Sequence, residues 1–121
     1  MLLNGGELDG ERILGRKTIE LMTMNHLPGG RALSELSVSP FTQIATSGNG
    51  FGLGFSVHLG SDKSQVIGTP GEYAWGGAAS TVFWIDPKEE LIVIFLTQFM
   101  PNATFNFRDQ LKALIYSALI D

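Results

Sequence analysis

The sequence predicts an α+β protein, a mostly antiparallel β-sheet with a C-terminal amphipathic helix packed on it. Two apolar runs, 81–85 and 91–96, flank the turn-forming segment Asp86-Pro87-Lys88-Glu89-Glu90, which is the pattern of a β-hairpin. Apolar residues recur at helical spacing between 107 and 119, opposite polar ones. With 121 residues, 44% hydrophobic and 17% charged, the chain is expected to form one folded domain over residues 1–121.

The first half of the chain is expected to hold small elements. Residues 1–6 have the pattern of a last helical turn closed by glycines, which fits either a frayed terminus or a chain that begins inside a longer ancestral protein. Asp9-Gly10 predicts a hairpin over 7–14, and the apolar spacing predicts a short helix over 16–25. Residues 28–50, with two prolines and many Ser and Thr, are expected to form a long irregular loop.

The second half supplies the predicted sheet and the final helix. Alternation of apolar residues over 51–59 predicts one strand with a single buried face. Residues 65–68 predict a weaker strand, and residues 71–79 form a glycine-rich segment that leads into the following strand. The run 91–96 is apolar on both faces, which is typical of a central, covered strand. Asn106 is the expected N-cap of the last helix, with Asp109 completing a capping box.

Composition excludes several classes of function. With no cysteine, the chain has no disulfide framework, thiolate zinc site or cysteine nucleophile. The net charge is −4 and the eight Lys and Arg residues are scattered, so neither nucleic acid nor an anionic membrane surface is an expected partner. No apolar run approaches the roughly 18 residues of a membrane span, and no secretion signal is visible. A cytoplasmic location is the default expectation, with no metal or cofactor.

A search for catalytic residues gives few candidates. The sequence contains neither Gly-x-Ser-x-Gly nor Ser-x-x-Lys. His26 follows a helix and precedes a proline, so it is interpreted as a partner of the helix C-terminus. His58 is expected to point away from the buried face of its strand, also in a structural role. Ser47-Gly48-Asn49 matches the pattern Ser-x-Asn, but a tripeptide in a loop rich in Ser and Gly carries little weight.

The most informative segment is Tyr73-Ala74-Trp75-Gly76-Gly77-Ala78-Ala79. Two glycines and two alanines at the start of a strand leave backbone N–H groups accessible. Backbone donors fixed before a substrate arrives are suited to stabilising an oxyanion. The alternative interpretation is a glycine bulge beside a packed tryptophan.

With this segment, the chain as a whole resembles the C-terminal third of the serine β-lactamase-like hydrolases, a superfamily that includes class C β-lactamases, family VIII carboxylesterases and penicillin-binding proteins. The resemblance also rests on residues 1–6, 17–22, 51–55 and 83–87. It implies a partial β-lactamase/transpeptidase-like fold. Trp75, Gly76 and Gly77 then stand where β-lactamases have Lys-Thr-Gly. The amide of Ala78 would form half of the oxyanion hole, and Tyr73 is added as a candidate pocket residue.

The family's nucleophile motif Ser-x-x-Lys and its Tyr-x-Asn motif have no match in this sequence. We therefore expect a truncated β-lactamase-related hydrolase that is inactive alone. Half of a split enzyme completed by an N-terminal partner chain, and a freestanding small-molecule-binding or interaction module, are the alternatives. Tryptophan at the lysine position favours esters over β-lactams. Relative to the family sheet, the strand at 91–96 lacks its neighbour, so a homodimer through this bare edge is expected.

Overall fold

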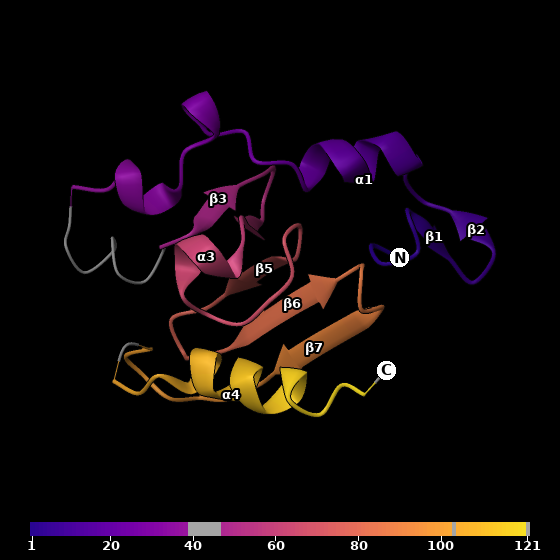
Figure 1. The fold of residues 1–121 in the computed structure, drawn as a ribbon. Coiled ribbons are helices and arrows are strands. Elements are labelled where there is room, and N and C mark those ends of the chain that lie inside the picture. Colours follow the sequence, from indigo (N-terminus) through magenta and orange to yellow (C-terminus); the bar gives the residue numbers. More distant parts are fainter. Residues whose placement is uncertain (39–46, 103, 121) are drawn as a thin grey trace.

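The computed structural model describes residues 1–38, 47–102 and 104–120. Its centre is a five-stranded sheet in the order β3-β4-β5-β6-β7, in which every neighbouring pair is antiparallel (Figure 1). The strands are β3 (Asn49–Phe51), β4 (Ser56–His58), β5 (Tyr73–Gly76), β6 (Val82–Asp86) and β7 (Leu91–Phe95). The predicted α+β class with a mostly antiparallel sheet is therefore confirmed.

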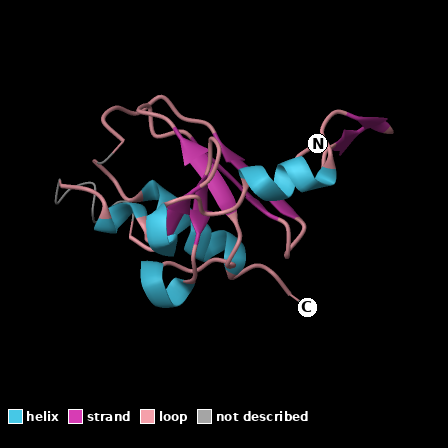
Figure 2. Cartoon of the chain, turned by 90° about the horizontal axis from the view of Figure 1, so that it is seen from above, coloured by secondary structure: helices cyan, strands magenta, loops and turns pink. Residues whose placement is uncertain are grey.

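The N-terminal elements form as their local patterns predict. The amide of Gly6 donates to the carbonyl of Met1, and the amide of Gly5 donates to the carbonyl of Leu2. These two hydrogen bonds form a Schellman motif, which ends a helical turn. Strands β1 (Glu7–Leu8) and β2 (Glu11–Arg12) pair across Asp9 and Gly10, whose φ angles of 52° and 83° fit a type I′ turn. This hairpin projects beyond the rest of the molecule (Figure 2).

The segment after the hairpin differs partly from its prediction. Helix α1 (Arg16–Met22) ends three residues earlier than expected. The ring Nε2 of His26 lies 2.7 Å from the carbonyl oxygen of Leu21, which confirms His26 as a partner of the helix end. The predicted loop over 28–50 contains the turns η1 (Pro28–Gly30) and η2 (Leu33–Glu35), and β3 begins within it. Its residues 39–46 lie outside the described part.

Two predicted strands are corrected. Residues 51–59 are not one strand, because the chain reverses after Phe51 and β4 pairs antiparallel with β3, with Phe51 opposite Ser56. The amide of Gly52 donates to the carbonyl of Phe55 across this turn. Residues 65–68 form no strand; they follow the single-turn helix α3 (Ser61–Ser64), which ends at Gln65 with a φ of 60°. That left-handed residue turns the chain away from the sheet.

Helix α4 (Phe107–Tyr116) packs on one face of the sheet, as predicted. Phe107 contacts Phe95 of β7, and the Lys112 Nζ lies 5.7 Å from the centre of the Trp84 ring in β6. The predicted capping box does not form, because the side chain of Asn106 makes no bond to the helix backbone and instead donates to the Asp109 carboxylate at 2.9 Å.

The opposite face of the sheet is covered over only part of its width. Val57, Tyr73 and Ile85 form a buried cluster there, with Leu2, Leu3, Phe55 and Phe83 packed against it. Further along the same face, on β7, Ile92 and Ile94 are exposed. The register places Ile94 opposite Phe83 and Ile92 opposite Ile85, so this apolar surface continues the core, and no described segment covers it.

The prediction that residues 91–96 form a central strand is wrong. β7 pairs with β6 on one side only and is the edge of the sheet. Its apolar character on both faces reflects α4 on one face and the continuation of the core on the other. The resemblance to the family sheet predicts that this strand has an unpaired edge, and β7 does lie at the end of the strand order.

A buried polar cluster fastens α4 to the sheet. Glu72 and Asp86 are almost fully buried, and the hydroxyl of Tyr116 lies 2.8 Å from Glu72 Oε2 and 2.7 Å from Asp86 Oδ2. Lys112 forms an ion pair with Glu72. Burial alone raises the pKa of Asp86, but hydrogen bonds from Thr69, Tyr116 and the amides of residues 88 and 89 outweigh it and lower the pKa. Burial and the two carboxylates raise the pKa of Tyr116.

His58 lies beside this cluster and should make stability depend on pH. Its ring is buried, Nε2 has no hydrogen-bond partner among the described residues, and burial together with Lys112 lowers its pKa. Below about pH 6.5 the unfolded chain therefore binds a proton that the folded chain does not, and stability falls as the pH falls, by at most about 1.4 kcal/mol per pH unit for one proton. Urea unfolding at pH 7.5 and 5.5 measures this loss.

His58→Gln is the matched variant for that measurement, because glutamine keeps a polar side chain but does not titrate. The stability difference between the two pH values should shrink in this variant. An equal difference in both proteins would show that His58 is not the group responsible.

Candidate functional site

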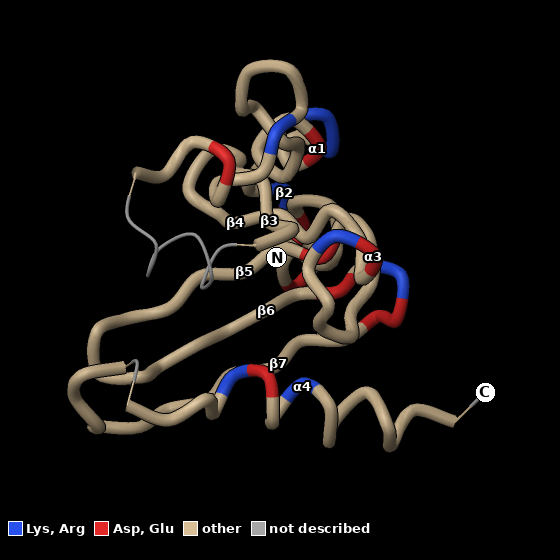
Figure 3. Tube along the Cα trace, turned by 60° about the vertical axis from the view of Figure 1, so that its left-hand side comes forward, with Lys and Arg blue, Asp and Glu red and all other residues tan. Residues whose placement is uncertain are grey.

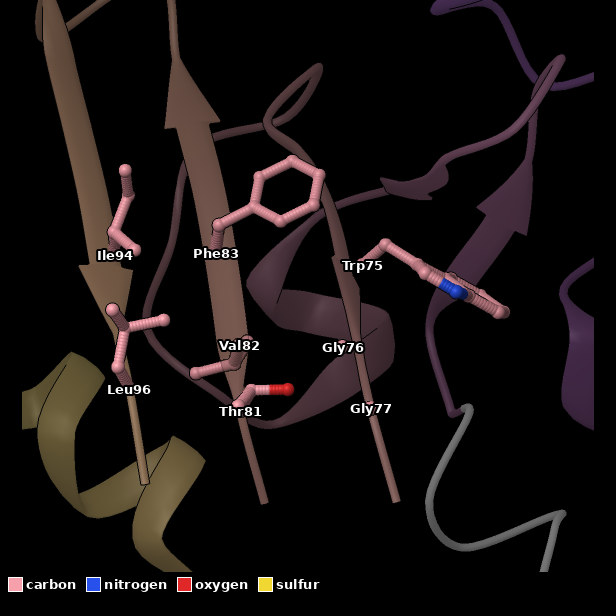
Figure 4. A pocket seen from close by; sticks show the side chains of 8 residues that line it. All are labelled: Trp75, Gly76, Gly77, Thr81, Val82, Phe83, Ile94 and Leu96. Atoms are coloured by element: carbon pink, nitrogen blue, oxygen red, sulfur yellow. The ribbon is translucent and has the colours of Figure 1, made fainter. Parts of the chain in front are cut away.

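The candidate site is a shallow depression at one end of strands β5, β6 and β7. It has a volume of about 370 Å³, and its walls are almost entirely apolar (Figure 4). Thr81 brings the only side-chain hydroxyl among the lining residues, which are Trp75, Gly76, Gly77, Thr81, Val82, Phe83, Ile94 and Leu96. Three of the residues singled out from the sequence, Trp75, Gly76 and Gly77, therefore border one surface.

The backbone of β5 is open on the side away from β6. β4 pairs with β5 only at Tyr73 and Ala74, so the strand continues past the end of its neighbour. The amide of Gly77 donates to the carbonyl of Thr81 at 3.0 Å, toward β6. Because N–H groups alternate between the two sides of a strand, the amide of Gly76 aims at the open side. Ala78 lies beyond the strand, and its N–H points away from the Gly77 carbonyl, which accepts a hydrogen bond from the amide of Ser80.

Ala78 lies in a β-turn and has an unoccupied amide. The amide of Ser80 donates to the carbonyl of Gly77 at 3.2 Å, and the Ser80 hydroxyl donates to Phe99 O at 2.7 Å. These bonds hold the turn without using the N–H of Ala78. Ala78 is exposed, and no hydrogen bond engages its amide among the described residues. The arrangement is a fixed backbone donor facing solvent, the geometry that oxyanion stabilisation needs.

The two aromatic candidates of this segment have different environments. The Trp75 side chain is half exposed and packs edge-on against Phe51, at a ring distance of 5.3 Å. Tyr73 is buried in the core cluster, away from the depression, and burial raises the pKa of its hydroxyl. Tyr73 instead borders a second hollow of about 190 Å³, near Ile19 and Pro87.

The serines considered as nucleophiles are engaged elsewhere. The Ser47 hydroxyl donates to the carbonyl of Lys63 at 3.2 Å, and Ser80 is almost fully buried. In the described ranges no three His, Cys, Asp or Glu side chains group as metal ligands would. Within the same ranges no helix combines the length and the apolar character needed to cross a membrane.

Sequence reasoning missed several residues of the site. Thr81, Ile94 and Leu96 are predicted only as strand residues, Phe83 also belongs to segment 83–87 of the family resemblance, and Arg108 falls among the polar residues of the last helix. The sequence predicts none of them as part of the site. The guanidinium of Arg108 lies against Gly76 and Gly77 from α4. No local pattern identifies such a contact, because 31 positions separate Arg108 from Gly77.

Comparison with known proteins identifies relatives that are much longer than this chain. Protein Rv1367c of Mycobacterium tuberculosis (strain ATCC 25618 / H37Rv) is 33% identical over 105 residues, which cover 84% of this chain and 25% of that protein. The chain thus spans about a quarter of the length of the curated relatives that it matches.

Solved structures with the same fold include two enzymes. EstCE1, described as a hydrolase with promiscuous acyltransferase activity, matches 94% of this chain and 26% of its own with a TM-score of 0.70 at 23% identity. The LovD9 mutant of simvastatin synthase from Aspergillus terreus matches 96% of this chain and 31% of its own with a TM-score of 0.71 at 24% identity. These matches confirm the partial β-lactamase-like fold.

The family model described as Beta-lactamase matches residues 6–117, nearly the whole chain. The expected relation to β-lactamase-like serine hydrolases is thereby confirmed. This chain belongs to the Beta-lactamase family.

Proposed function

We propose that residues 75–78 form the backbone wall of an ester-cleaving site in a β-lactamase-like serine hydrolase, with the amide of Ala78 as one donor to the oxyanion. The observation that supports this most strongly is the open edge of β5, where Ala78 is exposed and its N–H has no hydrogen-bond partner among the described residues. When a serine attacks an ester carbonyl, negative charge develops on its oxygen. A donor already in position stabilises that charge without reorganisation.

The nucleophile of the proposed reaction is supplied by polypeptide outside residues 1–121, on a longer form of the chain or on a partner. Ser-x-x-Lys and Tyr-x-Asn do not occur in the sequence. The hydroxyls of Ser47 and Ser80 both donate to main-chain carbonyls, and neither is hydrogen-bonded to a basic side chain within the described part of the chain. A truncated hydrolase, inactive alone, follows from this proposal.

An ester is the proposed substrate class. Trp75 occupies the position at which β-lactamases carry a lysine, and the depression beside it is apolar. Such a surface suits the uncharged acyl chain of an ester better than the carboxylate of a β-lactam. The acyl chemistry named for EstCE1 is consistent with this choice.

A graft into EstCE1 tests the backbone wall. Residues 73–78 of this chain replace the matching strand of EstCE1, and the chimera should still hydrolyse p-nitrophenyl butyrate. Ala78→Pro in the graft removes the N–H donor and should lower kcat by about 10²- to 10³-fold. Ala78→Gly keeps the donor and is the control. Equal kcat values for the proline and glycine chimeras would contradict the proposed role, provided both fold with the same Tm.

The isolated chain should turn over neither p-nitrophenyl butyrate nor the chromogenic β-lactam nitrocefin. Turnover abolished by a serine-directed phosphonate would contradict the absence of a nucleophile, and Ser47→Ala and Ser80→Ala would then identify the serine. Saturable binding of a small ester without turnover would instead support the freestanding binding module.

We also propose that the chain associates with a second copy through β7. The strand sequence Leu-Ile-Val-Ile-Phe carries no charge and no proline, and β5 and β7 are free of charged residues along their length (Figure 3). An uncharged edge strand is a template for pairing. Two copies can pair antiparallel about a two-fold axis, because the same edge then meets itself.

Light scattering after size exclusion tests the association. The chain should elute with twice its monomer mass of 13.1 kDa, and Ile94→Lys should convert it to a monomer by placing a charge on the paired strand. Leu114→Lys, at an exposed apolar position of α4, is the control and should leave the dimer intact. A monomeric parent chain would refute self-pairing and favour a different chain as the occupant of this edge.

A further inference from the structure

Arg108 reaches from α4 to the turn that carries the candidate oxyanion donor. Its Nη2 lies 3.3 Å from the carbonyl oxygen of Gly77 and 3.2 Å from that of Thr81. A Cβ on Gly76 would lie 2.6 Å from the same nitrogen. The missing side chain of Gly76 thus makes room for the guanidinium against the strand.

The charge of Arg108 is directed at peptide carbonyls rather than at a carboxylate. Among the described residues Arg108 forms no ion pair, and the neighbouring Asp109 accepts its hydrogen bond from Asn106. Arg108 is half-buried. A guanidinium in this position polarises the groups that it bonds more strongly than a neutral donor would.

The carbonyl of Gly77 and the amide of Ala78 belong to one planar peptide unit. In a trans peptide the C=O and N–H bonds point in opposite directions. The oxygen of this unit accepts hydrogen bonds from Arg108 and from the amide of Ser80, while its N–H faces the open edge of β5. Donors on the carbonyl withdraw electron density from the nitrogen, which makes the N–H a stronger donor.

We propose that Arg108 is a positioning residue, which fixes and polarises the Gly77–Ala78 peptide so that the Ala78 N–H is a strong donor to an oxyanion. This inference rests on the proposed function for the meaning of that N–H. The contact itself can be tested without any turnover, because the amide of Ala78 reports on its own peptide.

Amide exchange of the ¹⁵N-labelled chain measured by NMR separates polarisation from a merely structural role. Arg108→Met should shift the Ala78 amide proton upfield and slow its base-catalysed exchange several-fold, because the N–H becomes less acidic and a nearby positive charge is lost. Arg108→Lys should recover much of the parent exchange rate. If Arg108 only holds α4 against the turn, its replacement would leave the exchange rate of the Ala78 amide unchanged or increase it.

Arg31→Met is the control, since the exposed side chain of Arg31 bonds to the carbonyl of Pro28 and to no other described residue; it should leave Ala78 unaffected. Parent-like shift and exchange of Ala78 in Arg108→Met would overturn the inference. If Arg108→Met does not fold, Arg108→Gln, which keeps a donor without the charge, carries the same comparison. Failure of the EstCE1 graft would refute the proposed function while leaving this exchange result intact, so the two can be told apart.

Discussion

Lys112→Met is expected to lower the free energy of unfolding by about 3–5 kcal/mol, because it leaves a buried carboxylate without its counter-charge. The side chain of Glu72 is only 2% exposed and that of Lys112 14%. Among the described residues, Tyr116 alone would then remain as a side-chain hydrogen-bond partner of the Glu72 carboxylate, and its one hydroxyl also lies near Asp86. Urea unfolding at pH 7, followed by circular dichroism, measures the loss.

The double variant Glu72→Gln/Lys112→Met is the control for this interpretation. It removes both charges, so it should recover much of the lost stability. Lys17→Met, which breaks the exposed ion pair with Glu20, should have little effect. A double variant no more stable than Lys112→Met would show that lost packing, rather than the uncompensated charge, causes the effect.

Trp84→Ala is expected to cost about 3–5 kcal/mol of unfolding free energy, because it opens a cavity beneath α4. Trp84 is 1% exposed, whereas Trp75, nine positions earlier, is 50% exposed. Trp75→Ala is therefore a matched control in the same chain and should cost much less. Chemical unfolding of both variants measures the difference, and similar losses would contradict the placement of Trp84 in the core.

The two variants also have different consequences for the site. Trp84 faces α4, so its loss should weaken the contact that brings Arg108 to the turn. Trp75 borders the depression itself, so its replacement should change ligand contacts with little change in stability. A tryptophan's role therefore depends on which face of the sheet carries it.

Local patterns predicted the elements whose contacts are close in sequence. The turn at Asp9 and Gly10, the hairpin of β6 and β7 and the amphipathic helix α4 all follow from spacings of a few residues. Alternation failed at 51–59 for a definable reason. Residues 52–55 continue the alternation of apolar residues through the turn, so the pattern does not show where the chain reverses. The register then places Val57 on the face of Gly50 rather than on that of Phe51.

The candidate site was only partly predictable. Trp75, Gly76, Gly77 and Ala78 are predicted from the sequence because their run of small residues after a tryptophan matches a family motif. The structure places them at the end of β5 and in the turn that follows, rather than at the expected start of a strand. The lining residues of β6 and β7 have no signature of their own, since an apolar strand residue is equally suited to a core. Tyr73 neighbours the motif in sequence but faces the core, which only the strand geometry reveals.

By itself the sequence determined the fold class, because strands, turns and helices depend on residue types at short, regular spacings, and its motif segment indicated the family by resemblance. The tertiary structure alone decided that β7 is an edge strand, that Glu72, Asp86, Lys112 and Tyr116 form one buried cluster, and that Arg108 meets the Gly77–Ala78 peptide. These contacts join residues as many as 44 positions apart. Their partners are chosen by how strands pair and how α4 packs on the sheet, and no spacing along the chain records that choice.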